Sequence, residues 1–205
     1  MKRKKYDSLK DIYPEYISLD QMYQICGIAK RSALYLIKSG VVPAEDTGKR
    51  TWRYKIALTD LITYLRRREQ WGSMIPPGSM SSRGKHADKS GKPKPVRKCF
   101  ADILCIGSEN DLFEYFTYIY TDYPDLLSVY EVSEMTGLTT KSVFSRIKNG
   151  DLKALLDNSK LMVPKESLLL YASSWKFVES RCNSLHFQKV LNAFEIWIKR
   201  RNNGS

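Results

Sequence analysis

Apolar positions between residues 19 and 37 recur at the three- and four-residue spacing of amphipathic helices. Gly27 interrupts this pattern near its centre, where a tight turn between two helices favours a residue that tolerates positive φ. Gly40 follows the second apolar run, in the position of a glycine that ends a helix. The pattern predicts one helix over residues 19–26 and a second within residues 28–40, joined by a tight turn.

The same pattern returns 110 positions later, and residues 128–150 lie over residues 18–40 without a gap. The apolar spacing recurs, and six identical residues recur with it: Ser18, Gly27, Ser32, Ile37, Lys38 and Gly40 match Ser128, Gly137, Ser142, Ile147, Lys148 and Gly150. Chance would not repeat the turn glycine, the terminal glycine and the core spacing together. We therefore interpret the chain as two copies of one small unit.

A β-hairpin and a last helix are predicted after the two helices of each copy. In the first copy a turn over residues 45–50 precedes an alternating strand over residues 51–56, and the last helix covers residues 61–68. In the second copy we expect a hairpin over residues 151–161 and a helix that begins within residues 163–168. The predicted fold class is mainly α with small β-hairpin wings: two tandem winged helix-turn-helix domains joined by a flexible basic linker.

Composition shifts along the chain indicate four segments. Residues 1–15 read as a basic N-terminal arm, either a solvated tail or a source of phosphate contacts, and residues 16–75 form the first domain. Residues 76–98 are rich in Pro, Gly and Ser and hold seven Lys or Arg against one Asp, so we expect a disordered linker. This linker either follows a DNA backbone or acts as a spacer. Residues 99–205 form the second domain.

The second domain is expected to include two further helices. Residues 99–125 contain six acids, seven aromatic residues and no Lys or Arg, and they predict an acidic aromatic helix that ends before Pro124. An apolar stripe within residues 187–198 predicts a C-terminal helix. We expect the two helices to pack on each other. The alternatives are that the acidic helix packs on another protein and that the C-terminal helix binds a partner or a second copy.

The charge of the chain favours a polyanionic partner. Lys and Arg number 34 against 22 Asp and Glu, which gives a formal net charge of +12. No apolar run of about 18 residues is present in the sequence, so no transmembrane helix is expected. Nucleic acid fits better than a membrane surface, because no basic amphipathic helix with a broad apolar face precedes a lipid anchor. Residues 16–68 hold ten cations and four acids, whereas residues 126–174 hold six and five. The first copy is therefore the more favourable one for an anionic ligand.

The chain shows no motif typical of an enzyme. The four cysteines and two histidines lack metal-ligand spacing, so we expect reduced thiols in a cytosolic protein. A phosphate-binding glycine loop, a zinc motif and a serine with a plausible histidine base are all missing from the sequence. We predict a protein that is not an enzyme, with no catalytic residues, no cofactor and no metal.

The first copy resembles the excisionase family of winged helix-turn-helix proteins. The motifs that carry the resemblance are SG at residues 39–40, GKRTWRY at residues 48–54 and TDLITYL at residues 59–65. This family is similar to the DNA-binding domain of MerR-type regulators. The resemblance covers residues 16–68, and it implies that the second helix enters the major groove while the hairpin contacts the adjacent minor groove or backbone.

Carried over by position, the resemblance nominates DNA-binding residues in both copies. In the first copy these are Lys30, Arg31, Ser32, Tyr35 and Lys38 on the second helix, and Lys49, Arg50 and Arg53 on the hairpin. The corresponding candidates in the second copy are Thr140, Lys141, Ser145, Lys148 and Lys160. The second copy lacks Arg in its hairpin, so the resemblance there carries the fold better than it carries DNA binding. Trp52 is expected in the core as an anchor for the hairpin, and stacking on DNA is the alternative.

The resulting hypothesis is an accessory DNA-binding protein of site-specific recombination. An excisionase, or recombination directionality factor, of a mobile element binds and bends DNA near recombinase sites. The alternatives are a MerR-like transcriptional regulator of the element and an adaptor whose first copy binds DNA and whose second binds the recombinase. The expected partners are double-stranded DNA, a recombinase and, on DNA, further copies of the chain, in the nucleoid of a bacterial cytoplasm and without a membrane.

Overall fold

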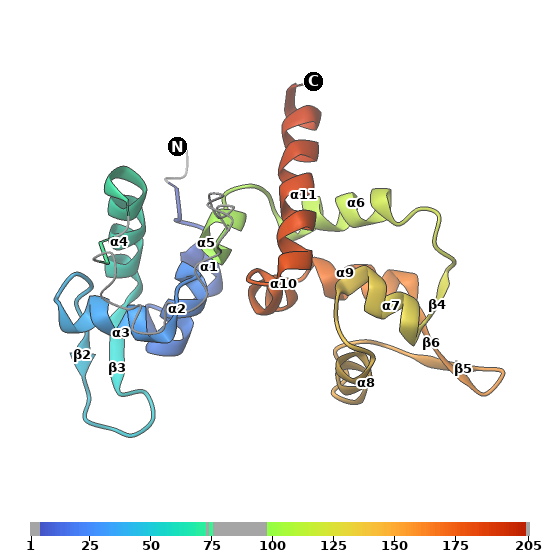
Figure 1. Cartoon of the computed structure of the whole chain (residues 1–205), viewed down its shortest axis with the longest axis horizontal. Coiled ribbons are helices and arrows are strands. Elements are labelled where there is room, and N and C mark those ends of the chain that lie inside the picture. The colour runs from blue at the N-terminus through green and yellow to red at the C-terminus, as the bar shows by residue number, and fades with distance from the viewer. Residues whose placement is uncertain (1–4, 73, 76–97, 204–205) are drawn as a thin grey trace, which may run out of the picture. The chain divides into compact units, whose positions relative to one another are not determined.

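The computed structural model describes residues 5–72, 74–75 and 98–203, which divide between two compact units (Figure 1). Unit 1 is Met1–Cys105 and unit 2 is Ile106–Ser205. Each unit is mainly helical and contains a small antiparallel sheet of three strands. This confirms the mainly α class with small β elements. The expected linker over residues 76–98 lies, except for Lys98, outside the described residues.

Unit 1 contains five helices and three strands within its described residues: α1 (Leu9–Ile12), β1 (Tyr16–Ser18), α2 (Leu19–Cys26), α3 (Lys30–Lys38), β2 (Glu45–Asp46), β3 (Tyr54–Ala57), α4 (Leu58–Trp71) and α5 (Phe100–Ile103). The two helices predicted within residues 19–40 are present as α2 and α3. Gly27 ends α2 with φ of 62°, and Gly40 follows α3 with φ of 72°, so both glycines take the left-handed conformation predicted for them.

The sheet of unit 1 has an additional strand that the sequence pattern missed. Strand β3 lies in the middle, with β2 on one edge and β1 on the other. Ile17 of β1 pairs with Ile56 of β3, and both side chains are buried. The strand β1 is only three residues long, too short to display an alternating pattern, and Ser18 at its end is also the N-cap of α2. Residues 47–53 form the loop between β2 and β3. The central strand therefore begins at Tyr54, three residues later than the alternating pattern predicts.

The segment expected to be a basic arm belongs in part to the core of unit 1. Its first four residues lie outside the described part of the chain, but Tyr6, Leu9 and Tyr13 are buried. Leu9 lies in the short helix α1, Tyr13 is its C-cap, and Tyr6 precedes the helix, so the three buried side chains alternate with the charged residues that dominate the composition. The arm prediction therefore fails for residues 6–13, because burial of these side chains outweighs the local charge.

Residues 99–105 also pack in unit 1, which moves the predicted start of the second domain. The ring of Phe100 meets the ring of Tyr13 edge to face at 6.3 Å between centroids. The Arg68 guanidinium on α4 donates to the Cys26 carbonyl at 2.8 Å and to Cys99 Sγ at 3.3 Å. These long-range contacts bring α5 to α2 and α4, and unit 2 begins at Ile106.

Unit 2 repeats the order strand, helix, helix, strand, strand, helix that runs from β1 to α4 in unit 1, with one helix before this segment and two after it. Its elements are α6 (Glu109–Ile119), β4 (Leu126–Ser128), α7 (Val129–Thr136), α8 (Thr140–Lys148), β5 (Leu155–Asp157), β6 (Lys160–Pro164), α9 (Lys165–Ser173), α10 (Trp175–Arg181) and α11 (Leu185–Asn203). Strand β6 is central, between β4 and β5. Asn158 and Ser159 have positive φ in the tight turn of the hairpin, as a type I′ turn requires.

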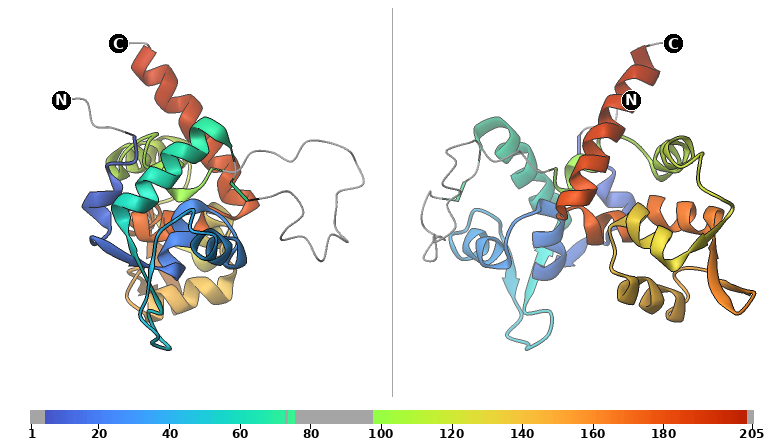
Figure 2. Two further views of the ribbon diagram at one scale, coloured as in Figure 1. Left: turned by 90° about the vertical axis from the view of Figure 1, so that its left-hand side faces the viewer. Right: turned by 45° about the vertical axis from the view of Figure 1, so that its right-hand side comes forward.

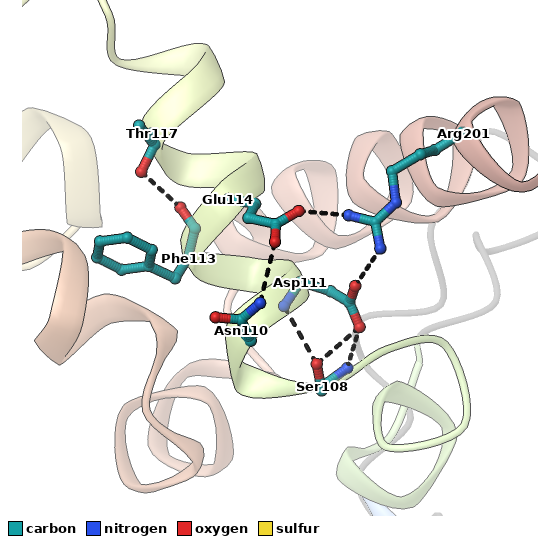
Figure 3. Close-up of polar contacts among 7 residues, drawn as sticks. All are labelled: Ser108, Asn110, Asp111, Phe113, Glu114, Thr117 and Arg201. Carbon is teal, nitrogen blue, oxygen red and sulfur yellow. Dashed lines mark hydrogen bonds and ion pairs between the residues drawn. The ribbon is translucent and has the colours of Figure 1, made fainter.

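The acidic aromatic helix and the C-terminal helix are present as α6 and α11, and they pack on each other as predicted (Figures 2 and 3). The Tyr115 ring lies 5.4 Å from Phe194 and 5.6 Å from Trp197 between centroids. Arg201 near the end of α11 forms ion pairs of 2.5 Å with Asp111 and with Glu114 of α6. Both helices therefore form part of the unit 2 fold.

Candidate functional site

A groove in unit 1 is lined by residues that include side chains of α3 and of the β2–β3 loop. Its volume is about 370 Å³, and its lining includes Lys30 and Lys38 from α3 and Arg50, Trp52 and Arg53 from the loop. Figure 2 shows the loop reaching away from the helices of unit 1. Four cations that are up to 23 positions apart in the sequence thus surround one solvent-accessible groove. We call it the cationic groove.

Helix α3 presents its polar residues to solvent because its apolar residues face the core. Ala33 and Leu36 are fully buried, whereas Lys30, Arg31 and Lys38 are exposed. Ser32 and Tyr35 are half-buried at the margin between these two faces. The N-cap of α3 is Ala29, whose side chain accepts no hydrogen bond, and the Ser32 amide donates to the Ala29 backbone carbonyl at 2.9 Å. The exposed N-terminal end of α3 is therefore cationic and has no side-chain cap.

The β2–β3 loop is held by a small set of polar contacts at its base. Asp46 accepts a hydrogen bond from the Gly48 amide at 3.0 Å and two-pronged contacts from the Arg53 guanidinium at 3.1–3.2 Å. The Thr47 hydroxyl donates to the Trp52 carbonyl at 2.9 Å. The Gly48 amide, and then the Arg53 guanidinium, hold the pKa of Asp46 below its usual value. The loop conformation thus depends on an ionised Asp46.

Trp52 lies outside the core, in contrast to the expected role as an anchor. Its side chain is 53% exposed, and its φ is 58°, an uncommon backbone conformation for an aromatic residue. The alternating pattern of residues 51–56 suggested an inward-facing Trp52. The strand β3 begins only at Tyr54, however, so the alternation of a strand does not apply at residue 52.

Two carboxylates that the sequence analysis did not select accompany the cations of the groove. Lys30 Nζ lies 2.7 Å from Asp20 Oδ1, and this hydrogen bond raises the pKa of Lys30. Asp46 forms the corresponding ion pair with Arg53, at 3.1 Å. Within the described residues, no ion pair is recorded for Lys38, Lys49 or Arg50. Arg31 and Lys49 are exposed on the same two elements, α3 and the loop, although they do not line the groove.

The candidate residues of unit 2 are also exposed, but their surroundings differ. Thr140, Lys141, Ser145, Lys148 and Lys160 are all solvent-accessible. Thr139 caps α8 by accepting a hydrogen bond from the Ser142 amide at 3.2 Å, whereas Ala29 offers α3 no such acceptor. The hairpin of unit 2 has no cation between Asp157 and Lys160, and it holds no Arg. The two copies thus share a backbone pattern and differ in their polar chemistry.

The cationic groove is suited to an extended anionic ligand. Its cations belong to two separate elements, and guanidinium and ammonium groups bind phosphate oxygens through charge-assisted hydrogen bonds. Among residues 5–72, 74–75 and 98–203, no cluster of His, Cys, Asp and Glu is arranged to hold a metal ion. In the same ranges, no helix has the length and apolar character that crossing a membrane needs.

Comparisons of this chain with protein-family models, with curated proteins and with solved structures find no match.

Proposed function

We propose that unit 1 is a winged helix-turn-helix domain that binds double-stranded DNA through the cationic groove. Helix α3 enters the major groove, which is wide enough for an α-helix, and the β2–β3 loop acts as the wing on the adjacent minor groove or backbone. The observation that carries the proposal is that Lys30 and Lys38 of α3 and Arg50 and Arg53 of the loop line one groove.

The proposed contacts are of two kinds: contacts with base edges, which read the DNA sequence, and contacts with phosphates, which position the protein on the duplex. Arg31 and Lys30 lie in the first turn of α3, the part that contacts base edges in helix-turn-helix proteins, and an Arg contacts guanine through two hydrogen bonds. Ser32, Tyr35 and Lys38 follow along the helix and contact bases or phosphates. Lys49, Arg50 and Arg53 contact phosphates from the wing, and they add affinity without reading the sequence.

The proposed role of this binding is accessory to site-specific recombination. The resemblance of residues 16–68 to excisionases supports a protein that binds and bends DNA near recombinase sites, in a bacterial nucleoid. The MerR-like regulator uses the same DNA contacts, and the genes beside this one distinguish the two roles. A neighbouring recombinase gene favours control of excision, and a divergent operon favours regulation.

The test is binding by the full chain to duplexes selected from a randomised library, titrated at fixed salt. Arg31→Ala and Arg50→Ala should each weaken binding by about 1–3 kcal/mol where the contact reaches a base edge, and the equivalent change Lys141→Ala should cost less. The exposed Arg67→Ala on α4, outside the groove, is the matched control. Unchanged affinity for both Arg31→Ala and Arg50→Ala would contradict the proposal.

A further inference from the structure

The register of the two sheets aligns unit 2 with the cationic groove, residue by residue. Ser18 pairs with Lys55 in unit 1, and Ser128 pairs with Met162 in unit 2. Glu45 pairs with Lys55, and Leu155 pairs with Met162. The strand β5 therefore matches β2, and the helices α7 and α8 match α2 and α3 at the offset of the sequence repeat. Each groove residue of unit 1 on these elements has a defined counterpart.

Two of the counterparts on the helices are exposed aromatic residues. Asp20 and Leu34 line the cationic groove, and their counterparts are Tyr130 on α7 and Phe144 on α8. Tyr130 is 65% exposed and Phe144 is 51% exposed. Where unit 1 holds a carboxylate that pairs with Lys30, unit 2 thus exposes an aromatic ring, and Thr140 replaces the lysine itself.

The hairpin of unit 2 shows the same change. Asp46, which binds Arg53 in unit 1, corresponds to Leu156, and the side chain of Leu156 is 75% exposed. Leu156 lies directly across from Leu161, the counterpart of the groove residue Tyr54, so the two leucines point to one side of the sheet. Between the paired strands, unit 1 has the loop 47–53, with three cations, whereas unit 2 has only a tight turn.

Cations remain beside this apolar surface. Helix α8 carries Lys141, Arg146 and Lys148 and no acid. Lys141, Phe144 and Lys148 follow one another at intervals of three and four residues, so they lie along one face of the helix, and the exposed ring sits between the two lysines. Arg146 is engaged within the unit, with Asp151 at 3.2 Å. The surface is therefore apolar at its centre and positive along α8.

We propose that this face of unit 2, defined by Tyr130, Phe144, Leu156, Lys141 and Lys148, binds a short segment of another protein that carries apolar anchors flanked by acidic residues. Aromatic and leucine side chains provide apolar contacts, and the lysines are complementary to carboxylates. Duplex DNA fits this face poorly, because its centre is apolar and a tight turn replaces the loop 47–53 that carries three cations in unit 1. This inference does not depend on DNA binding by unit 1. If both proposals hold, the chain is an adaptor that binds DNA through unit 1 and another protein through unit 2.

The test is selection of peptides from a displayed random library on the full chain, followed by binding titrations with the selected peptides. We expect the selected sequences to combine aromatic or aliphatic residues with Asp or Glu. Phe144→Ser and Leu156→Thr should each weaken binding about tenfold or more, and Lys141→Glu with Lys148→Glu should weaken it further. Ile196→Ser on α11 removes an equally exposed apolar side chain, at 52%, and should leave binding unchanged.

Four results would overturn the inference. The first two are that the library yields no binder that depends on Phe144, and that the selected peptides lack acidic residues. The other two are that duplex DNA competes with the peptide for this face, and that the chain self-associates in a way that Phe144→Ser abolishes. The last two assign the face to DNA or to a second copy. The substituted side chains are exposed, so unchanged circular dichroism and melting temperature of each variant establish that the fold is kept.

Discussion

The Arg53 guanidinium donates hydrogen bonds to the carboxylate of Asp46 across the base of the β2–β3 loop. Its Nε lies 3.2 Å from both carboxylate oxygens, and its Nη2 lies 3.1 Å from Oδ2. The same carboxylate accepts the Gly48 amide at 3.0 Å. One ionised side chain thus orients a groove cation and fixes the turn that follows. Both partners are solvent-accessible, so the pair acts on the order of the loop more than on global stability.

Acidification should loosen this loop at a pH below the usual titration range of Asp. Since the pKa of Asp46 is lowered in the folded chain, the carboxylate stays ionised and keeps the Gly48 amide bonded until the pH falls through the lowered value. Hydrogen exchange of the Gly48 amide, corrected for intrinsic pH dependence, should lose protection only in that acidic window. Asp46→Ala, which removes the acceptor, should lose protection at neutral pH, and equal protection in the variant and the wild type would refute the role of Asp46.

Replacing Trp52 should cost little stability, in contrast to replacing a core aromatic residue. The side chain is 53% exposed and the backbone has φ of 58°, a conformation that glycine adopts without strain. Trp52→Gly should therefore leave the unfolding free energy of unit 1 within about 1 kcal/mol of the wild type. Phe100→Ala, which truncates a fully buried ring, should cost about 3–5 kcal/mol in the same chemical denaturation experiment. A comparable loss for Trp52→Gly would mean that Trp52 anchors the hairpin.

Gly137 should be more sensitive to substitution than Gly150, although both have positive φ. A Cβ atom at Gly137 would lie 2.8 Å from His186 Cδ2, whereas none of the described neighbours comes within 4 Å of a Cβ at Gly150. Gly150→Ala should destabilise unit 2 by about 1 kcal/mol through backbone strain alone. Gly137→Ala should cost about 1–3 kcal/mol more, because the new methyl group overlaps the imidazole.

The double variant Gly137→Ala with His186→Ala separates the two causes. Removal of the imidazole leaves only the strain of the left-handed backbone, so the double variant should recover most of the difference between the two alanine substitutions. Thermal unfolding of the full chain gives the required ranking. Equal losses for Gly137→Ala and Gly150→Ala would show that the contact with His186 relaxes at no cost.

Arg201 should stabilise unit 2 through its ion pairs with Asp111 and Glu114, and the pair with Asp111 should depend on pH. Burial by itself raises the pKa of Asp111, but the hydrogen bonds from Ser108 and the Arg201 ion pair outweigh it, so the pKa is lowered in the fold (Figure 3). The stabilisation is therefore complete above the ordinary Asp pKa and is lost as the pH falls through the lowered value. Arg201→Gln should lower the melting temperature at neutral pH, and the difference from the wild type should vanish in acid. A difference that persists there would contradict the ion pair as its source.

The sequence was sufficient for the elements whose signals are local. Ser18 and Ser128 cap their helices within three residues, and Gly27 and Gly137 close the turns next to them, so spacing alone located α2, α3, α7 and α8. The hairpin turn at Asn158 and Ser159 was equally local. The candidate cations on α3 could also be selected, because buried Ala33 and Leu36 define the opposite face of the helix.

The features that were missed depend on contacts between distant residues. The charged segment before residue 16 gives no local sign that Tyr13 packs on Phe100, nor does Cys99 indicate its contact with Arg68. The strand β1 exists because β3 offers it a partner. Asp20 and Asp46 became part of the site only when the fold placed them against Lys30 and Arg53.

DNA binding by unit 1 is tested most directly by an amide chemical-shift map of the isotope-labelled full chain, titrated with a selected duplex. The chemical shifts should change in Lys30–Lys38 and in the β2–β3 loop around Arg50, and those of Thr140–Lys148 should stay unchanged. Shifts confined to unit 2, or a saturating complex that leaves α3 and the loop unperturbed, would contradict it.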